Sequence, residues 1–149
     1  MSRFYFAYGS NMKRSRLEYR IGEVIDHGIV SKQDCRIAFN KQSTDGTGKT
    51  NLVTPAEQQE VLGVLYELTE DQLKKLDGIE KGYVRIPIVI DWGSETKEVQ
   101  TYIAVDSMVN NELLPKADYL QHLIDGASEH GFPEEYQKSL KGFAVVNET

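Results

Sequence analysis

Two stretches in the middle of the chain alternate hydrophobic and polar residues. The apolar or β-branched positions recur at every second residue: Val84, Ile86, Ile88 and Ile90, then Val99, Thr101, Ile103 and Val105. Because successive side chains of a strand point to opposite faces of a sheet, this pattern predicts a β-hairpin with one buried face and a turn over residues 93–98. Pro87 cannot donate a ladder hydrogen bond, so it predicts a sheet edge or a bulge.

The N-terminal region predicts a strand, a tight loop and a helix. Residues 4–8 are strand formers that stop at Gly9, and a helix-compatible basic stretch runs from Asn11 to about Arg20. We expect Ser10 or Asn11 to cap this helix, with the free N–H groups of its first turn facing the loop and attracting an anion. Further short strands are predicted near residues 28–30, 35–39 and 61–67, and an exposed loop in the 40s.

Helical patterns occupy the middle and the last third of the chain. Thr69-Glu70-Asp71-Gln72 matches a capping box, which predicts a helix to about Asp77, ended by Gly78, with Glu80 outside it. Apolar residues at helical spacing over 119–127 predict a second helix with a stop at Gly131, and Pro133 opens a third. Many short strands with helices mainly in the last third predict an α+β fold, a closed or strongly curved mixed β-barrel with flanking α-helices, in a single domain over residues 1–149.

Composition narrows the class of protein. The 149 residues carry a formal net charge of −6, which argues against nucleic-acid binding, and the basic run Lys13, Arg14, Arg16 and Arg20 is interpreted as a solvated helix face. The only cysteine is Cys35, so no intrachain disulfide can form. The apolar runs are too short for a signal peptide or a membrane span. We therefore expect a cytoplasmic protein that binds no membrane, and we interpret the glycosylation pattern Asn147-Glu148-Thr149 as chance.

Three motifs are set aside on their context. Gly46-Thr47-Gly48-Lys49-Thr50 resembles the end of a phosphate-binding loop, but Ser43 stands where the first glycine belongs and no helix is predicted after it. Ser10 lacks the second flanking glycine of a hydrolase elbow. The histidines are scattered in the sequence, at His27, His122 and His130, so no metal site is predicted.

The remaining candidates are the loop Tyr8-Gly9-Ser10-Asn11 and the carboxylate of Glu80. From residue types alone, a Gly-Ser-Asn turn is ordinarily a helix cap, and a glutamate between glycines is ordinarily an exposed loop residue. Spacing alone therefore leaves the presence of an enzyme site open.

Three blocks in the same order resemble the γ-glutamylcyclotransferase family. The first is Tyr5-Phe6-Ala7-Tyr8-Gly9-Ser10-Asn11-Met12, with Arg16 following, and the second is Leu76-Asp77-Gly78-Ile79-Glu80 with Tyr83. The third covers residues 119–140 and includes Gly126-Ala127 and Glu135-Tyr136-Gln137. The segment 44–55 has no counterpart, and the approach to Tyr83 is shorter than in the animal enzyme. The resemblance implies a closed β-barrel with flanking helices.

The resemblance also implies an activity, the cyclisation of a γ-glutamyl amino acid or peptide to 5-oxoproline with release of the amine. Glu80 would be the acid–base catalyst, since one carboxylate can take a proton from the α-ammonium and deliver it to the leaving nitrogen. Backbone N–H groups of Gly9, Ser10 and Asn11 would hold either the α-carboxylate or the oxyanion. The family positions that line the pocket are Tyr8, Tyr83 and Tyr119. No cofactor is expected.

Several alternatives stay open at this point. Sister enzymes act on γ-glutamyl amines or remove a γ-glutamyl protecting group with the same loop and glutamate. A non-catalytic module that binds a small metabolite or a protein is a rival of another class, because fold does not determine function. The expected partner is a small γ-glutamyl compound, and a homodimer is left open.

Overall fold

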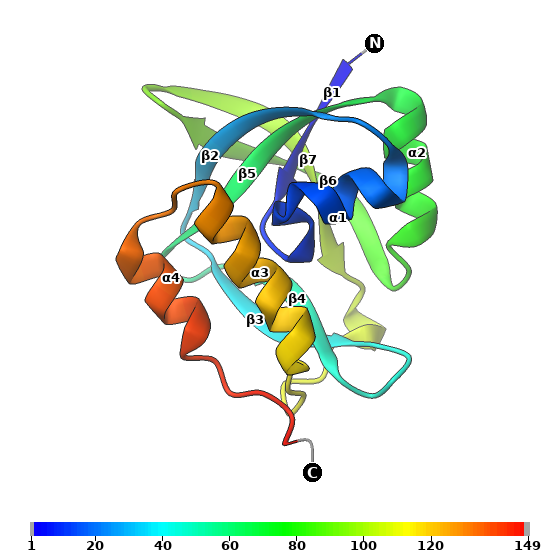
Figure 1. Cartoon of the computed structure of the whole chain (residues 1–149), viewed down its shortest axis with the longest axis vertical. Coiled ribbons are helices and arrows are strands. Elements are labelled where there is room, and N and C mark those ends of the chain that lie inside the picture. The colour runs from blue at the N-terminus through cyan, green and yellow to red at the C-terminus, as the bar shows by residue number, and fades with distance from the viewer. Residues whose placement is uncertain (1, 148–149) are drawn as a thin grey trace.

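Five strands close into a barrel in the computed structural model of the protein, which describes residues 2–147 (Figure 1). In order around the barrel they are β1 (Ser2–Ala7), β5 (Glu60–Thr69), β2 (Ile25–Gln33), β6 (Tyr83–Trp92) and β7 (Glu95–Ala104). Neighbouring strands are antiparallel except β1 and β7, which are parallel and close the barrel through Tyr5 and Gln100. The predicted closed mixed barrel is therefore confirmed. Residues 148 and 149 of the glycosylation pattern lie outside the described residues.

A second sheet of two strands lies outside the barrel and corrects one prediction. It consists of β3 (Arg36–Gln42) and β4 (Gly48–Val53), so the exposed loop predicted for the 40s shrinks to the turn between these strands. Thr50 and Asn51 are buried in β4. Polar side chains are stable there because they are hydrogen-bonded, as where the Oδ1 atom of Asn51 accepts a bond of 2.9 Å from the N–H of Ala104.

Helices flank the barrel, as predicted. They are α1 (Arg14–Ile21), α2 (Glu70–Ile79), α3 (Ala117–Glu129) and α4 (Glu134–Lys141), with short 3₁₀ turns η1 (Ser10–Met12) and η2 (Asp106–Met108). The third helix ends before Gly131, whose φ of +69° is a glycine conformation, and Pro133 caps the fourth. Both of these predicted helices are confirmed.

The helix caps near the site differ from the prediction at two places. The first α-helix begins at Arg14 with Lys13 as its N-cap, because Ser10 and Asn11 belong to the separate turn η1, so the predicted Ser10 or Asn11 cap is wrong. In α2 the capping box of Thr69 is present, but the helix continues through Gly78 to Ile79. Glu80 is its C-cap and lies just outside the helix, as expected.

The predicted hairpin is present, but both faces of its second strand are covered. β6 and β7 pair in register from Tyr83↔Ala104 to Trp92↔Glu95 around a tight turn at residues 93–94. The prediction of a single buried face is wrong, because Tyr102 and Val99 are buried in two different hydrophobic clusters. The registered pair between β6 and β2 is Ser31↔Asp91, and Pro87 lies outside it. The missing N–H of Pro87 therefore removes no hydrogen bond to β2.

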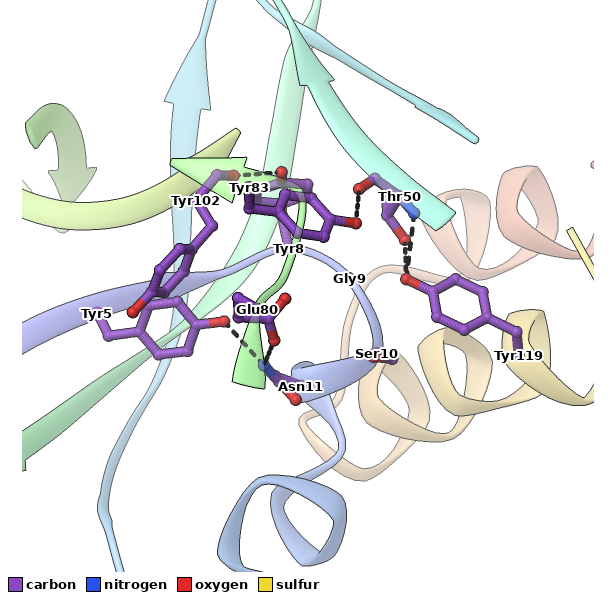
Figure 2. Close-up of a pocket in the computed structure, with 10 residues that line it drawn as sticks. All are labelled: Tyr5, Tyr8, Gly9, Ser10, Asn11, Thr50, Glu80, Tyr83, Tyr102 and Tyr119. Atoms are coloured by element: carbon purple, nitrogen blue, oxygen red, sulfur yellow. Dashed lines mark hydrogen bonds between the residues drawn. The ribbon is translucent and has the colours of Figure 1, made fainter. Parts of the chain in front are cut away.

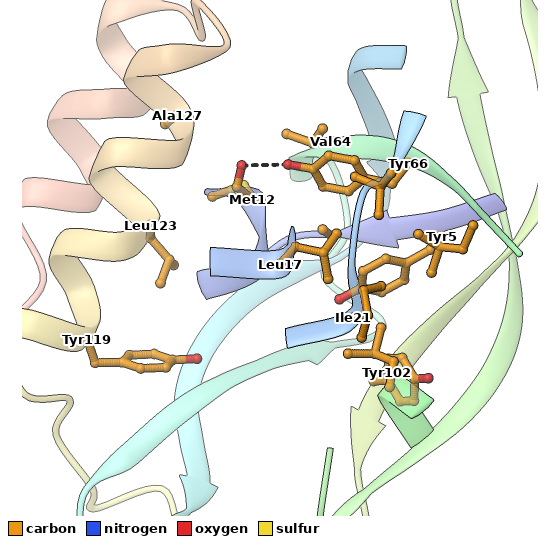
Figure 3. Packing of buried hydrophobic residues seen from close by; sticks show 14 of the residues in the cluster. Tyr5, Met12, Leu17, Ile21, Val64, Tyr66, Tyr102, Tyr119, Leu123 and Ala127 are labelled. Carbon is orange, nitrogen blue, oxygen red and sulfur yellow. Dashed lines mark hydrogen bonds between the residues drawn. The ribbon is translucent and has the colours of Figure 1, made fainter. Parts of the chain in front are cut away.

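The turn η1 is held from two sides, which positions the loop before it. Tyr66 of β5 donates a hydrogen bond of 2.9 Å from its hydroxyl to the carbonyl of Met12 (Figure 3). On the other side α3 approaches so closely that a Cβ atom on Gly126 would lie 2.6 Å from the carbonyl carbon of Met12. Only glycine fits at this crossing. Residues 8–12 are therefore fixed by β5 and α3 together.

Candidate active site

A small cavity of about 40 Å³ opens beside the end of β1 (Figure 2). It is lined by Tyr5, Tyr8, Gly9, Ser10, Asn11, Thr50, Glu80, Tyr83, Tyr102 and Tyr119. The structure thus brings all seven predicted site residues together, from segments far apart in the sequence. It adds Tyr5, Thr50 and Tyr102, which no sequence pattern singles out as site residues.

The carboxylate of Glu80 lies in this cavity and is oriented through one of its oxygens. Its side chain is 14% exposed, and its Oε1 atom accepts bonds from Asn11 Nδ2 at 3.2 Å and from Arg20 Nη1 at 3.0 Å. Oε2 has no hydrogen-bond partner among residues 2–147. One oxygen is therefore held in place while the other is available to exchange a proton.

The side chain of Asn11 connects the loop to the carboxylate. The amide is buried, and its Nδ2 atom also donates to the hydroxyl of Tyr5 at 3.1 Å. Its Oδ1 atom accepts from Arg20 at 3.1 Å. Asn11 therefore contributes an orienting side chain, whereas its sequence context predicts only a backbone donor and a helix cap.

The tyrosine hydroxyls around the cavity are already engaged. Tyr8 donates to the carbonyl of Tyr102 at 2.5 Å, and Tyr83 donates to the carbonyl of Thr50 at 2.7 Å (Figure 2). A phenol has one proton, so these two hydroxyls can only accept further hydrogen bonds. Burial raises the pKa of both tyrosines well above the ordinary value, which keeps them neutral. Such acceptors suit an ammonium group.

Thr50 joins the tyrosines to the loop. Its N–H donates to the hydroxyl of Tyr119 at 3.1 Å, and its Oγ1 lies 2.8 Å from the same oxygen. A Cβ atom on Gly9 would lie 3.0 Å from Thr50 Oγ1. The loop backbone therefore packs against β4, and a side chain at residue 9 would push into this contact.

Of the three predicted backbone donors, Ser10 and Asn11 belong to the turn η1, and Gly9 is its N-cap. The N–H groups of Met12 and Lys13 are bonded to the carbonyls of Gly9 and Ser10. In the part of the chain that the structure describes, no backbone carbonyl in a turn or loop accepts a hydrogen bond from the N–H of Ser10 or Asn11. The start of a 3₁₀ turn leaves its first N–H groups without acceptors inside the turn.

An outer chamber of about 310 Å³ continues from the cavity and shares Ser10, Glu80, Tyr83 and Tyr119 with it. Its other walls carry five cationic side chains: Arg16, Arg20, Lys41, Lys49 and Lys81. The interpretation of Arg16 and Arg20 as part of a solvated helix face is wrong, because α1 turns both toward the chamber. Their spacing of four residues, which puts them on one helix face, was the available signal.

The motifs set aside in the sequence have structural roles. Gly48, Lys49 and Thr50 begin β4, so no helix follows the phosphate-loop-like segment. His27 pairs with Glu67, and His130 pairs with Asp26. Among the described residues, no group of three or more potential metal ligands was found, and no helix is long and apolar enough to cross a membrane.

Comparison with known proteins places this chain in a family. The model of the AIG2-like family matches residues 60–140. The chain is 31% identical over 147 residues to a γ-glutamylcyclotransferase of Bos taurus, covering 91% of this chain and 76% of the bovine protein. It is 31% identical over 148 residues to a γ-glutamylcyclotransferase of Homo sapiens, covering 92% and 76%.

Solved structures agree with the sequence comparison. A γ-glutamyl cyclotransferase structure superimposes with a TM-score of 0.87 at 28% identity, covering all of this chain and 92% of the other. The resemblance found in the sequence is thus confirmed over nearly the whole length, including the barrel and the flanking helices. The chain belongs to the γ-glutamylcyclotransferases within the AIG2-like family.

Proposed function

We propose that this protein is a γ-glutamylcyclotransferase, in which Glu80 moves the protons and the loop of residues 8–11 holds the substrate. The observation that carries the proposal is the carboxylate of Glu80, 14% exposed and fixed through Oε1, with Oε2 free beside that loop. The name shared by the relatives supports the same reaction for this chain.

The reaction needs a neutral amine next to its own γ-carbonyl. The α-ammonium of the substrate would donate hydrogen bonds to the hydroxyl oxygens of Tyr8 and Tyr83, whose protons are committed to backbone carbonyls. Oε2 of Glu80 would then take one proton from it. Holding nucleophile and electrophile together in this way removes about 7–11 kcal/mol of barrier in well-oriented intramolecular reactions.

The bond changes balance without water or an oxidant. The α-nitrogen forms a bond to the γ-carbon, and the bond from that carbon to the second nitrogen breaks. The electron pair goes to the departing nitrogen, which takes the proton from Glu80. The regenerated carboxylate then removes the second proton from the ring nitrogen and passes it to the released amine, which leaves as an ammonium ion. General acid–base catalysis of this kind contributes about 10²–10⁴-fold in rate.

The N–H groups of Gly9, Ser10 and Asn11 are the proposed anion donors. They can hold the α-carboxylate or the oxygen that becomes negative during the attack, because both anions accept bonds from backbone N–H groups. Arg20 supports this role indirectly. Its guanidinium donates hydrogen bonds to both Asn11 and Glu80 and so connects the loop to the catalytic carboxylate. We regard Arg20 as a positioning residue.

The test is product formation from a panel of substrates. Purified protein is incubated with γ-glutamyl dipeptides and with γ-glutamyl-ε-lysine, and 5-oxoproline is measured by mass spectrometry. We expect product from the dipeptides. Product from the ε-linked lysine alone would assign the protein to the γ-glutamylamine enzymes, and binding without product would make it a binding module.

The physiological setting is also a proposal. We propose that a small γ-glutamyl compound is the only partner the protein requires. A cavity of about 40 Å³ that opens to a larger chamber is consistent with a substrate of this size. We further propose a cytoplasmic location, and fractionation of cells that express the protein tests it.

A further inference from the structure

We propose that the outer chamber is a leaving-group subsite that selects acidic amino acids, so that γ-glutamyl-glutamate and γ-glutamyl-aspartate are the preferred substrates. The inference rests on the proposed function. It adds the chemical class of the leaving group and the residues that recognise it, Arg16, Lys41 and Lys49.

These three cations have no carboxylate partner. Within the described residues, none of them makes an ion pair, whereas Arg20 in the same chamber is paired with Glu80. The buried Nε atom of Arg16 has no hydrogen-bond acceptor among residues 2–147. A buried donor without an acceptor is costly, and a bound anion would satisfy it.

The acidic side chains around these cations do not neutralise the group. Glu80 attracts Lys41 and Arg16 but is paired with Arg20. Asp45 is near Lys49 but accepts hydrogen bonds from Thr47 and lies 3.6 Å from the ammonium of Lys116. Asp118 is exposed and acts only at a distance on Arg16 and Lys49. The chamber therefore keeps an excess of positive charge.

The two lysines are held against each other by the fold. Lys41 of β3 and Lys49 of β4 are direct cross-strand partners, although like charges in this arrangement are destabilising. Lys41 is only 8% exposed, and burial lowers its pKa and that of Lys49. Their ammonium groups lie 5.0 Å from the ring centre of Tyr83 and 4.1 Å from that of Tyr119, at the border of the inner cavity.

The position of the chamber points to the leaving group. Because Glu80 lines both spaces, a γ-carbonyl beside it has the glutamyl amine on the inner side and the departing amine on the outer side. A departing glutamate or aspartate carries two carboxylates into a space that holds these three cations and a fourth, the exposed Lys81, which also has no ion pair among the described residues. A neutral alkylamine would leave all three without a partner.

The experiment compares substrates that share the γ-glutamyl group and differ in leaving-group charge. We expect the kcat/KM of the wild type to fall from γ-glutamyl-glutamate to γ-glutamyl-alanine and then to γ-glutamyl-ethylamide. In the Lys49→Met variant, the first substrate should lose about tenfold more than the last, the scale of one charge-assisted hydrogen bond.

Lys97→Met is the matched control. Its ammonium also lies 4.1 Å from an aromatic ring centre, that of Phe4, but on β7 and away from both spaces. It should keep the substrate order of the wild type. A second variant, Lys49→Gln, retains a polar side chain and guards against a folding defect, which circular dichroism would report.

The proposal is overturned if Lys49→Met and Lys49→Gln weaken all three substrates equally, since the lysines would then hold the glutamyl α-carboxylate. It is also overturned if the wild type has no preference for γ-glutamyl-glutamate. Ionic strength gives a readout without mutation, because the screening length falls from about 30 Å to about 3 Å between 0.01 and 1 M salt. The preference should shrink over this range. Absence of 5-oxoproline from every substrate would instead refute the proposed function.

Discussion

The inner cavity and the outer chamber share four residues but differ in how their polar groups are satisfied. In the cavity the tyrosine hydroxyls are bonded to backbone carbonyls and to Thr50, and the carboxylate of Glu80 is held through one oxygen. In the chamber Arg16, Lys41 and Lys49 have no ion-pair partner among the described residues.

The difference indicates a division of labour. A site that performs one reaction gains from groups fixed before the substrate arrives, since no reorganisation is then needed. A site that distinguishes substrates gains from groups that are satisfied only by the right partner. The next four predictions test the rigidity of the inner cavity, beginning with the largest expected effect.

The first prediction concerns alkaline pH, where the tyrosine-rich interior should come apart. Burial raises the pKa of seven of the eight tyrosines, to about 12 for Tyr136. An unfolded chain releases these protons near pH 10 and the native chain does not, so stability is complete below pH 10 and falls above it. In a pH titration, the phenolate absorbance of the native protein should rise at higher pH than that of the denatured protein. It should then increase together with unfolding. A gradual rise without unfolding would contradict the engaged cavity.

The second prediction concerns the proposed catalytic role of Glu80. Glu80→Gln should reduce kcat by about 10²–10⁴-fold, since a neutral amide cannot accept the proton. The amide oxygen can still accept the bonds from Asn11 and Arg20, so the variant should remain folded. Glu98→Gln, a change at an exposed glutamate of β7, is the control. A folded Glu80→Gln enzyme with normal turnover would remove Glu80 from the mechanism.

The third prediction concerns the loop backbone. Gly9→Val should weaken substrate binding by about a hundredfold, because its Cβ atom would press on Thr50, and overpacking typically costs about 1–3 kcal/mol. Gly78→Val serves as the control, since a Cβ atom there meets nothing within 4 Å. Calorimetry with a γ-glutamyl dipeptide gives the affinity. Equal affinities in both variants would argue against the loop as the cradle.

The fourth and smallest effect is expected from Thr50→Val. The change removes the hydroxyl that lies 2.8 Å from the Tyr119 oxygen, while the backbone bonds of residue 50 can persist. Loss of one such hydrogen bond should reduce the free energy of unfolding by about 1 kcal/mol. We expect kcat/KM to fall by no more than about tenfold, the same energy scale. Urea unfolding and steady-state kinetics measure the two effects.

The sequence predicts strands well where burial follows hydrophobicity and poorly where polar residues are buried. The β6–β7 hairpin was recognised because alternation is strong in it. β4 was missed because Thr50 and Asn51 are polar, and only the tertiary structure supplies their hydrogen-bond partners. Gly78 was interpreted as a helix end, although α2 continues to Ile79. Local propensity is a weak prior against such tertiary effects.

The site was predicted only in part. The loop and Glu80 were identified through family resemblance, and the structure brings them into one cavity. Tyr5 is not distinguished from the other aromatic residues of its strand, although its hydroxyl contacts Asn11. Arg20 belongs to a run of basic residues, and the packing of α1 determines that its side chain reaches Glu80. The pairing of Lys41 with Lys49 depends on a strand register that the sequence did not reveal.

The crossing at Gly126 has a consequence for biosynthesis. Since α3 and β5 together fix the turn at Met12, a chain emerging from the ribosome cannot set its opening loop until its last third is available. The contact of Asn11 with Glu80 joins segments 69 residues apart, and that of Thr50 with Tyr119 does the same, so the site around Glu80 is complete only once Tyr119 has joined it. A nascent fragment would therefore be inert toward γ-glutamyl compounds until synthesis is nearly finished.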